Sequence, residues 1–552
     1  MKPFLRADSP VALATLFVVA AAFFWIGNGR TSLWDRDEPR YAETARQMRE
    51  RGDYIVPYFN DQFRFQKPVL TYWLVAASYA VFGENDFAAR AVSGLCLATV
   101  LVLIARLGDR MFGRPAGMLA ALMFAVTPIA LILGKLVLPD GPQLLASMVC
   151  MTAMYRSCRR RDGRPSGFWP LAFWVALAAS ILVKGPIVLG MVALTLVALW
   201  LLTGIRPSEF QLEWKWGPVL TLLLSLPWLA AIYSTAGPEF FSEAVGKQVV
   251  RRFGESFDQR FLPPGYYALT ALLCLAPWTG FVLLAFLRRW RRFRERTPEA
   301  FLAAWTFGPM VLLELFRSKQ PHYFAPAYPA MMLLAAGYLA PILRKESGWP
   351  LGFAGRTAGW WPGLIGVGAA VAVGRFGASL DRDGASWAFI AAAILAVAGA
   401  TATWLMARRR LAASIQLQWV GAATALVVLV SAVLPAMDRD RVTRKIAARL
   451  SREPAPALYV FNCIEPSLVY YSHRPVIDYF EQPHLLRPLI NGEVDPLVAA
   501  PASELPRLQQ CVGRPAHVEE TLYGWLRMHK ETVHLVRFGR EMATSEDGRV
   551  AR

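Results

Sequence analysis

Charged residues are scarce in this chain of 552 residues: they make up 18% of it, whereas soluble domains carry roughly 25%. Hydrophobic residues reach 55%, with 19 Trp and 32 Phe, and the mean hydropathy is +0.34. A soluble chain of this length would form three or four domains of roughly 150 residues. The apolar surface here exceeds what such cores require. The composition therefore excludes a soluble protein and indicates a membrane protein.

Cysteines are also few, and common cofactor motifs are missing. Of the six cysteines, only Cys463 and Cys511 share the C-terminal region, where a disulfide between them stays open. The sequence has no HExxH, no paired-cysteine motif, no Walker loop and no GxGxxG in a βαβ context. These absences argue against nucleotide-driven chemistry.

What the chain does have is a series of apolar segments, each close to the roughly 20 residues that cross a bilayer. A fourteenth segment, 69–83, is apolar but only fifteen residues long, and we expect it to lie along the interface. The thirteen expected spans are 10–28, 87–108, 115–136, 141–156, 168–184, 185–204, 217–235, 264–287, 300–316, 325–343, 359–376, 387–407 and 416–437.

Basic clusters fix the expected orientation of these spans. The net charge of +19 is concentrated in loops that all fall on one side if 69–83 does not cross. We therefore expect the N-terminus and these clusters in the cytoplasm, the tail in the periplasm, and no nucleic-acid partner. The clusters are Lys2 with Arg6, Arg110 with Arg114, Arg156 to Arg164, Arg288 to Arg296, Arg344 with Lys345, and Arg408 to Arg410.

The predicted architecture is a mostly α-helical polytopic membrane protein. Residues 1–437 form the transmembrane domain, with external loops at 30–68 and 236–262. In the first loop, Tyr41, Ala45 and Met48 share one helical face, which predicts an interfacial helix. Residues 438–552 are expected to form a small periplasmic α/β domain, with strands near 457–461 and 475–479.

Carboxylates beside apolar spans are the first candidates for catalytic residues. Placing a charged group there costs free energy unless it faces water or a partner. Asp37 and Glu38 stand in the first loop and Asp140 in the next short one. Asp35 is the better candidate for capping the interfacial helix, and Asp37 for function. For Asp140, a simple turn before Gly-Pro is an equal alternative.

Basic residues on the expected outer side are exceptions to the rule that Lys and Arg gather in cytoplasmic loops, so each calls for a binding partner. Lys67, Arg252 and Lys319 suit an anionic headgroup, and ion pairing with loop carboxylates is the alternative. Lys184 reaches the same water layer, or it snorkels toward it. His322 is the lone histidine of residues 1–437. It could bind a divalent metal only together with carboxylates, and the sequence contains no ligand spacing that requires a metal.

The chain resembles the bacterial lipid A aminoarabinose transferases, polyprenyl-phosphate-dependent glycosyltransferases of the GT-C fold related to protein O-mannosyltransferases. The resemblance rests on segments within the first 340 residues. They are Asp37-Glu38-Pro-Arg-Tyr41, Gly52-Asp-Tyr-Ile-Val-Pro57, Lys67-Pro68, Asp140, Lys184-Gly185, Arg252-Phe253, and Lys319 to Pro329. Family members commonly have Glu before Lys-Pro, where this chain has Gln66, so no essential carboxylate is expected there.

The resemblance implies a function and a set of site residues. It implies transfer of 4-amino-4-deoxy-L-arabinose from undecaprenyl phosphate to a lipid A phosphate at the periplasmic face, which confers polymyxin resistance, with no required cofactor. Asp37, with Glu38, is the implied catalytic carboxylate, and Asp140 a second one. Lys67, Arg252, Tyr323, Tyr328 and Lys319 are implied to bind the carrier phosphate, and Tyr41 and Lys184 to line the substrate cavity.

Two other functions stay open. The first is a related transferase with another carrier-linked sugar or with a protein hydroxyl as acceptor, for which Asp37 would act as a base. The second is a transporter of lipid-linked sugars, which should show inverted repeats and charges near the midplane; neither stands out in the sequence.

Overall fold

The computed structural model describes residues 9–158, 167–243, 263–350, 353–455, 457–482, 485–486, 496–526 and 529–539. The chain divides into two compact units. Unit 1 contains Met1–Thr31, Met48–Pro57 and Arg64–Ala436, and unit 2 contains Ser32–Gln47, Tyr58–Phe63 and Met437–Arg552. Two pieces of the first loop therefore group with the tail.

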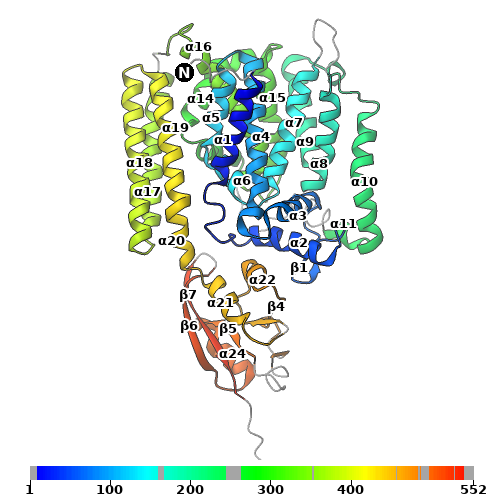
Figure 1. The fold of residues 1–552 in the computed structure, drawn as a ribbon. Coiled ribbons are helices and arrows are strands. Elements are labelled where there is room, and N and C mark those ends of the chain that lie inside the picture. Colours follow the sequence, from blue (N-terminus) through cyan, green and yellow to red (C-terminus); the bar gives the residue numbers. More distant parts are fainter. Residues whose placement is uncertain are drawn as a thin grey trace, which may run out of the picture. The chain divides into compact units, whose positions relative to one another are not determined.

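Unit 1 is a bundle of helices (Figure 1). Its first half contains α1 (Pro10–Trp25), α3 (Leu70–Phe82), α4 (Asp86–Phe112), α5 (Ala116–Ala125), α6 (Pro128–Lys135), α7 (Asp140–Ser157), α8 (Trp169–Lys184), α9 (Ile187–Thr203), η1 (Pro207–Glu209), α10 (Gly217–Ala236) and α11 (Glu239–Phe241). Its second half contains α13 (Tyr266–Cys274), α14 (Thr279–Arg289), η3 (Trp290–Arg294), α15 (Pro298–Glu314), η4 (Pro321–Ala327), α16 (Tyr328–Leu343), α17 (Phe353–Gly377), α18 (Arg382–Ala407), α19 (Leu411–Val428), η5 (Leu429–Val433) and the start of α20 (Leu434–Arg439).

Local sequence signals set where these helices begin and end. The Asn85 side chain accepts a hydrogen bond from the Ala88 amide and caps α4, and Thr127 caps α6 in the same way. Gly185, with φ +80°, follows the last residue of α8, a backbone conformation that favours glycine. Lys184 is therefore fixed at the end of α8.

Helices of unit 1 approach closely where small residues meet. A Cβ added to Gly117 of α5 would lie 1.8 Å from the Ala105 carbonyl oxygen of α4, so only glycine fits there. A single cation caps the C-terminus of α1: Lys135 Nζ donates to the Phe24 and Ile26 carbonyls at 3.1 and 2.7 Å. These contacts hold α1, α4, α5 and α6 together.

Unit 1 has the character of a multi-pass membrane protein. Within the described residues, six helices are long and apolar enough to cross a bilayer, and the bent pair α5 and α6 makes a seventh if it counts as one span. Apolar side chains such as Leu223 and Val371 are more than half exposed to the surroundings. Such surfaces suit lipid and not water. The count of thirteen spans stays a prediction.

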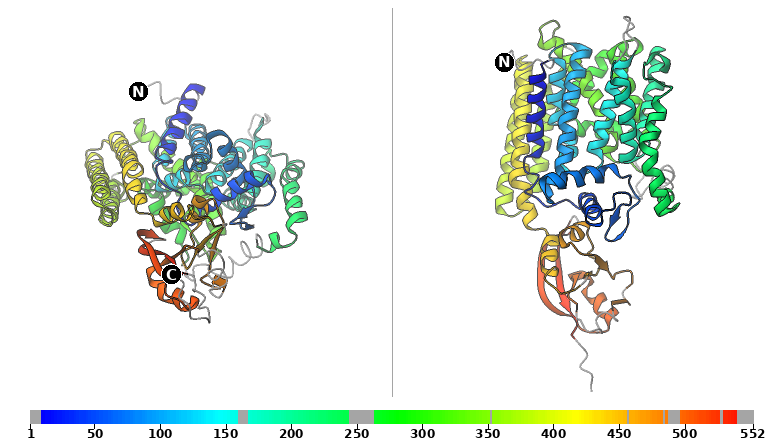
Figure 2. Two further views of the ribbon diagram at one scale, coloured as in Figure 1. Left: turned by 60° about the horizontal axis from the view of Figure 1, so that its bottom comes forward. Right: turned by 45° about the vertical axis from the view of Figure 1, so that its right-hand side comes forward.

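Segment 69–83 forms α3, which runs across the ends of the bundle helices and not along them (Figure 2). This is the orientation that an interfacial helix requires. The helix predicted in the first loop is α2 (Glu38–Arg51). Its Tyr41, Ala45 and Met48 are all buried, so the predicted inward face is confirmed.

Unit 2 is built around a mixed five-stranded sheet of order β4-β3-β5-β7-β6. Its strands are β3 (Leu458–Val460), β4 (Val476–Asp478), β5 (Val498–Pro501), β6 (His517–Leu526) and β7 (His529–Arg537), and its helices are α21 (Val442–Leu450), α22 (Pro466–Ser472), η7 (Ala502–Glu504) and α24 (Leu505–Val512). A short hairpin, β1 (Tyr58–Phe59) with β2 (Gln62–Phe63), belongs to the same unit.

The strands alternate between two apolar cores, as side chains on a pleated strand must. Leu458 and Val460 pack with α21 and α22 on one face of the sheet. Tyr459 and Phe461 pack with α24 on the other. The result is a sheet covered by helices on both faces, and the runs expected to be strands contain β3 and β4.

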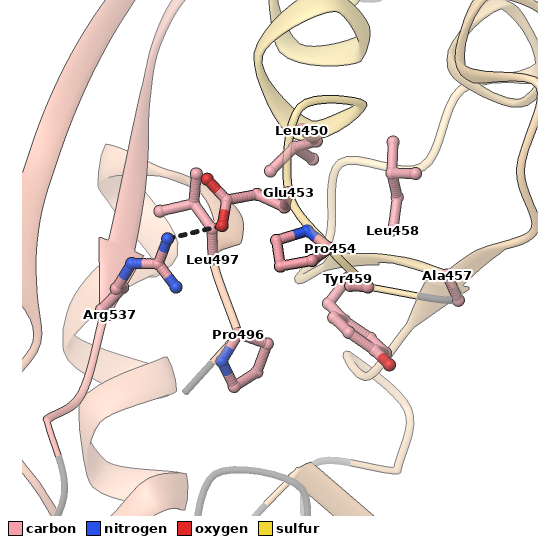
Figure 3. A pocket seen from close by; sticks show the side chains of 10 residues that line it. Leu450, Glu453, Pro454, Ala457, Leu458, Tyr459, Pro496, Leu497 and Arg537 are labelled. Carbon is pink, nitrogen blue, oxygen red and sulfur yellow. Dashed lines mark hydrogen bonds and ion pairs between the residues drawn. The ribbon is translucent and has the colours of Figure 1, made fainter. Parts of the chain in front are cut away.

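A small cavity of about 70 Å³ lies beside β3 (Figure 3). Glu453 and Arg537 face each other at its edge, with their side-chain atoms 2.6 Å apart. Burial opposes the ionised form of Glu453, but hydrogen bonds from Arg537 and Arg449 outweigh it and lower the pKa of that carboxyl. This ion-pair network closes the edge of the sheet and leaves little room for a ligand.

Candidate functional site

A buried ion pair is the centre of the candidate site in unit 1. Lys184 Nζ lies 2.6 Å from Asp140 Oδ1, and the two side chains are only 11% and 8% exposed. Asp140 is the first residue of α7 and Lys184 the last of α8, so two adjacent antiparallel helices present the pair at one end. The pair favours a joint role of the two side chains over the turn suggested for Asp140 and the snorkelling suggested for Lys184.

An aromatic side chain and two further basic groups surround this pair. The ring of Tyr323 lies 4.8 Å from Lys184 Nζ, a cation–π contact, and His322 packs edge-on against Tyr323. Lys67 and His322 both act electrostatically on the Asp140 carboxylate. The structure thus brings together five residues selected from the sequence; we call Asp140, Lys184, Tyr323, His322 and Lys67 the lysine cluster.

Two other predicted phosphate ligands are engaged within the protein. Lys319 Nζ lies 2.5 Å from Glu314 Oε2, with the lysine side chain 4% exposed. The Glu314 carboxylate also accepts the Tyr267 amide, at 3.0 Å. Tyr328 is fully buried and its hydroxyl donates to the Pro321 carbonyl at 3.2 Å. These contacts favour the ion-pair alternative for Lys319, and a phosphate-binding role for either residue stays a prediction.

Sequence reasoning missed Gln143 and Glu314. Gln143 lies one turn after Asp140, is 3% exposed, and neither atom of its amide has a hydrogen-bond partner among the described residues. A polar residue within an apolar span is a recognisable signal, and it would have selected Gln143. Glu314 is the last residue of the apolar helix α15 and gives a similar signal, next to the segment that carries Lys319.

The first-loop candidates lie in unit 2. Asp37 is 65% exposed, and its carboxylate lies 3.6 Å from Arg40 Nη1. Glu38 is buried, and its carboxylate accepts the Trp34 amide at 2.8 Å, which fixes the turn that precedes α2. Tyr41 is 4% exposed. Of the three, only Asp37 presents its polar group to the surroundings.

Asp35 does not cap α2, contrary to the expectation from sequence. Its carboxylate accepts the Ser467 amide at 2.7 Å and lies 3.0 Å from Arg441 Nη2. Arg441 also donates to the Leu33 carbonyl at 2.6 Å. Burial raises the pKa of the Asp35 carboxyl, against the lowering effect of Arg441 and Ser467. The stretch before Asp37 is thus tied to the tail by a buried ion pair.

Replacing Arg441 by methionine should destabilise the full-length protein by about 3–5 kcal/mol, because Asp35 is left buried without its counterion. The folded-state pKa of Asp35 is already raised, so charge on it costs stability above its ordinary pKa. The loss should therefore be greater at pH 7 than at pH 4, measured as the shift of the thermal midpoint of purified protein.

The matched control is Arg444→Met, since Arg444 is 58% exposed and lies 3.9 Å from Asp438. Its midpoint should stay close to that of the unchanged protein. Equal midpoints for the two variants at pH 7 would contradict the anchoring role of Arg441.

Three expectations gain no support from geometry. Arg252 lies outside the described residues, as do Arg251 and most of the loop 236–262. Among the described residues, no group of three or more His, Cys, Asp or Glu side chains is gathered as a metal site would need. All six cysteines, including Cys463 and Cys511, are free thiols.

The lysine cluster combines one carboxylate with two ammonium groups and an imidazole. A partly buried site with excess positive charge suits an anionic group such as a phosphate, which Lys binds as a point charge. Its place at the end of apolar helices suits a ligand with an apolar tail. The geometry therefore fits the leaving group of a lipid-linked phosphate.

Known proteins share both sequence and fold with this chain. The sequence profile of the dolichyl-phosphate-mannose-protein mannosyltransferases matches residues 66–230. Proteins named undecaprenyl phosphate-alpha-4-amino-4-deoxy-L-arabinose arabinosyl transferase are similar: that of Yersinia pestis is 30% identical over 339 residues, and that of Yersinia enterocolitica 29% identical over 345. The alignments span 60% of this chain and of the first relative, and 62% and 61% of this chain and the second.

Solved structures extend the likeness to nearly the whole chain. ArnT from Cupriavidus metallidurans bound to undecaprenyl phosphate superposes with a TM-score of 0.78 over 95% of this chain and 98% of that one, at 19% identity. The apo structure gives a TM-score of 0.75 at 20% identity. Likeness at this identity shows the fold, and the fold of this chain is that of ArnT.

Proposed function

We propose that this protein transfers 4-amino-4-deoxy-L-arabinose from undecaprenyl phosphate to a phosphate of lipid A, and so confers resistance to polymyxin and other cationic peptides. The observation that carries the proposal is the full-length likeness to a structure that binds undecaprenyl phosphate. The similarity to named aminoarabinose transferases supports it over 339 residues.

In this proposal the chain's own residues stabilise the departing carrier phosphate. Charge develops on that phosphate as the sugar leaves, and preorganised cations are the strongest means of stabilising it. Lys67 and Arg252 are the proposed ligands, and Tyr323 is proposed as a third. The Asp140 carboxylate holds Lys184 in place.

The acceptor needs less activation by the protein than the departing carrier phosphate needs stabilisation. A lipid A phosphate is largely deprotonated at neutral pH, so Asp37 is proposed to position the acceptor or the cationic amino group of the sugar. No cofactor is required in this proposal. A divalent ion held by His322 with carboxylates is the alternative.

The proposed setting is the bacterial inner membrane, with thirteen spans, the N-terminus in the cytoplasm and the active site facing the periplasm. The basic clusters support this orientation, since loops rich in Arg and Lys stay in the cytoplasm. The short α3 supports it as well, because a helix that lies along the interface leaves all the clusters on one side.

A second candidate is transfer of a carrier-linked sugar to a protein hydroxyl. The match of residues 66–230 to the protein mannosyltransferases favours it. The two candidates differ in the acceptor, and therefore in the need for a base.

Purified full-length protein, incubated with undecaprenyl phosphate–aminoarabinose and lipid A, tests the proposal directly. We expect lipid A to gain the mass of one aminoarabinose, detected by mass spectrometry, and Lys67→Ala to reduce this product by about 100-fold. Lys215→Ala is the matched control, because Lys215 carries the same charge and is exposed in the loop before α10. Unmodified lipid A together with a glycosylated protein acceptor would favour the second candidate.

A further inference from the structure

A second polar cavity opens at the opposite end of the bundle from Asp140. Its volume is about 430 Å³, and Arg110, Arg156 and Arg296 line it together with Tyr155. Arg110 lies near the end of α4, Arg156 near the end of α7, and Arg296 just before α15. Since α7 starts at Asp140 and rises 1.5 Å per residue, about 25 Å separate this arginine pocket from the lysine cluster.

Two of the three guanidinium groups of this pocket contact neighbours outside it. Arg296 Nη1 and Nη2 donate to the two Glu209 carboxylate oxygens at 2.8 and 3.3 Å. The Arg156 guanidinium stacks over the Trp169 ring, 4.9 Å from its centroid. Arg110 is exposed, and its charge acts on the Tyr155 hydroxyl. The described residues that line the pocket include three arginines and no Asp or Glu, and Glu209 balances the charge of only one of them, Arg296, so the net charge of these groups is positive.

The remaining walls of the arginine pocket are apolar. Phe301 packs edge-on against Tyr155, with ring centroids 5.2 Å apart, and Phe210 and Leu199 complete the wall. A soluble anion would gain nothing from such walls, whereas a lipid can place its phosphate on the arginines and its glycerol and chains against them. Basic pockets between membrane helices bind anionic lipid headgroups for this reason.

We propose that the arginine pocket binds the phosphate headgroup of an anionic phospholipid. The volume is within the range of ligand sites, and the planar guanidinium groups of arginine side chains suit the binding of a phosphate. The site is separate from the proposed transfer reaction and adds a lipid ligand at the other membrane face.

Native mass spectrometry of detergent-purified full-length protein tests this directly, with phosphatidylglycerol and phosphatidylcholine as probes. We expect phosphatidylglycerol to bind at least about tenfold more tightly than phosphatidylcholine, because only the former carries net negative charge. The double variant R110A/R296A should lose this preference. R288A is the matched control: Arg288 is exposed near the same end of the bundle, does not line the pocket, and should leave the preference unchanged.

Three results would overturn the proposal. They are a preference that persists in R110A/R296A, displacement of the lipid by millimolar inorganic phosphate, and tighter binding of undecaprenyl phosphate with the same sensitivity to R110A/R296A. The second would indicate a plain anion site and the third a carrier site. Because binding is measured without transfer, this result is independent of whether the protein transfers aminoarabinose.

Discussion

Replacing Asp140 by asparagine is expected to reduce transfer of aminoarabinose to lipid A by about 100-fold or more. The carboxylate holds Lys184 Nζ at 2.6 Å beside the Tyr323 ring, so its loss releases the ammonium from the position it has in the lysine cluster. The product is measured by mass spectrometry of lipid A, from purified protein or from a strain that lacks its own enzyme.

Loss of the pair also affects folding, and a second variant separates the two effects. Asp140→Asn leaves Lys184 buried without its counterion, a loss of about 3–5 kcal/mol. The double variant D140N/K184Q removes both charges, so its thermal midpoint should recover relative to D140N while transfer stays low. If transfer recovered together with the midpoint, the pair would be structural and not part of the reaction.

The matched control for this series is Asp86→Asn. Asp86 is the first residue of α4, as Asp140 is of α7, and both helices begin at the same end of the bundle. The Asp86 carboxylate is absent from the lysine cluster, so transfer by this variant should match that of the unchanged protein. A comparable loss in D86N would mean that any acid at this end supports activity through folding alone.

The sequence was sufficient to predict that Asp140 and Lys184 lie at the same end of the bundle. Alternation of the spans places the start of 141–156 and the end of 168–184 on one side, so Asp140 and Lys184 were expected in one water layer. Their pairing was not predicted, because it depends on the packing of α7 against α8. The face of α2 that contains Tyr41 followed from helical spacing, which is a local property.

Contacts between distant parts of the chain lay beyond local patterns. Asp35 bonds to residues 406 and 432 positions away, and its neighbours in sequence suggested only a helix cap. Similarly, Lys319 pairs with Glu314, which belongs to the end of a preceding helix and not to the loop where partners were sought. In both cases the charged side chain is buried and pairs with the opposite charge that the tertiary structure places next to it, which local sequence does not show.

Asp37→Asn should reduce transfer by about 100-fold while leaving stability nearly unchanged. The side chain is 65% exposed and its contact with Arg40 is long, at 3.6 Å, so an exposed pair of this kind contributes at most about 1 kcal/mol. A large loss of activity without loss of stability would therefore mean that the carboxylate acts on a substrate. Asp61→Asn is the matched control, because Asp61 is an exposed acid of the same loop with φ +60°, which asparagine tolerates.

The kinetic form of the Asp37→Asn loss distinguishes the two roles open to this carboxylate. If it holds the cationic amino group of the sugar, the loss appears mainly as a raised KM for the donor lipid. If it is the base for a hydroxyl acceptor, kcat falls and the KM for the donor stays the same. A lipid A phosphate needs no deprotonation at neutral pH, so we expect the first pattern. Wild-type transfer by Asp37→Asn would remove this residue from the site and leave the lysine cluster as the candidate that the described part of the chain supports by geometry.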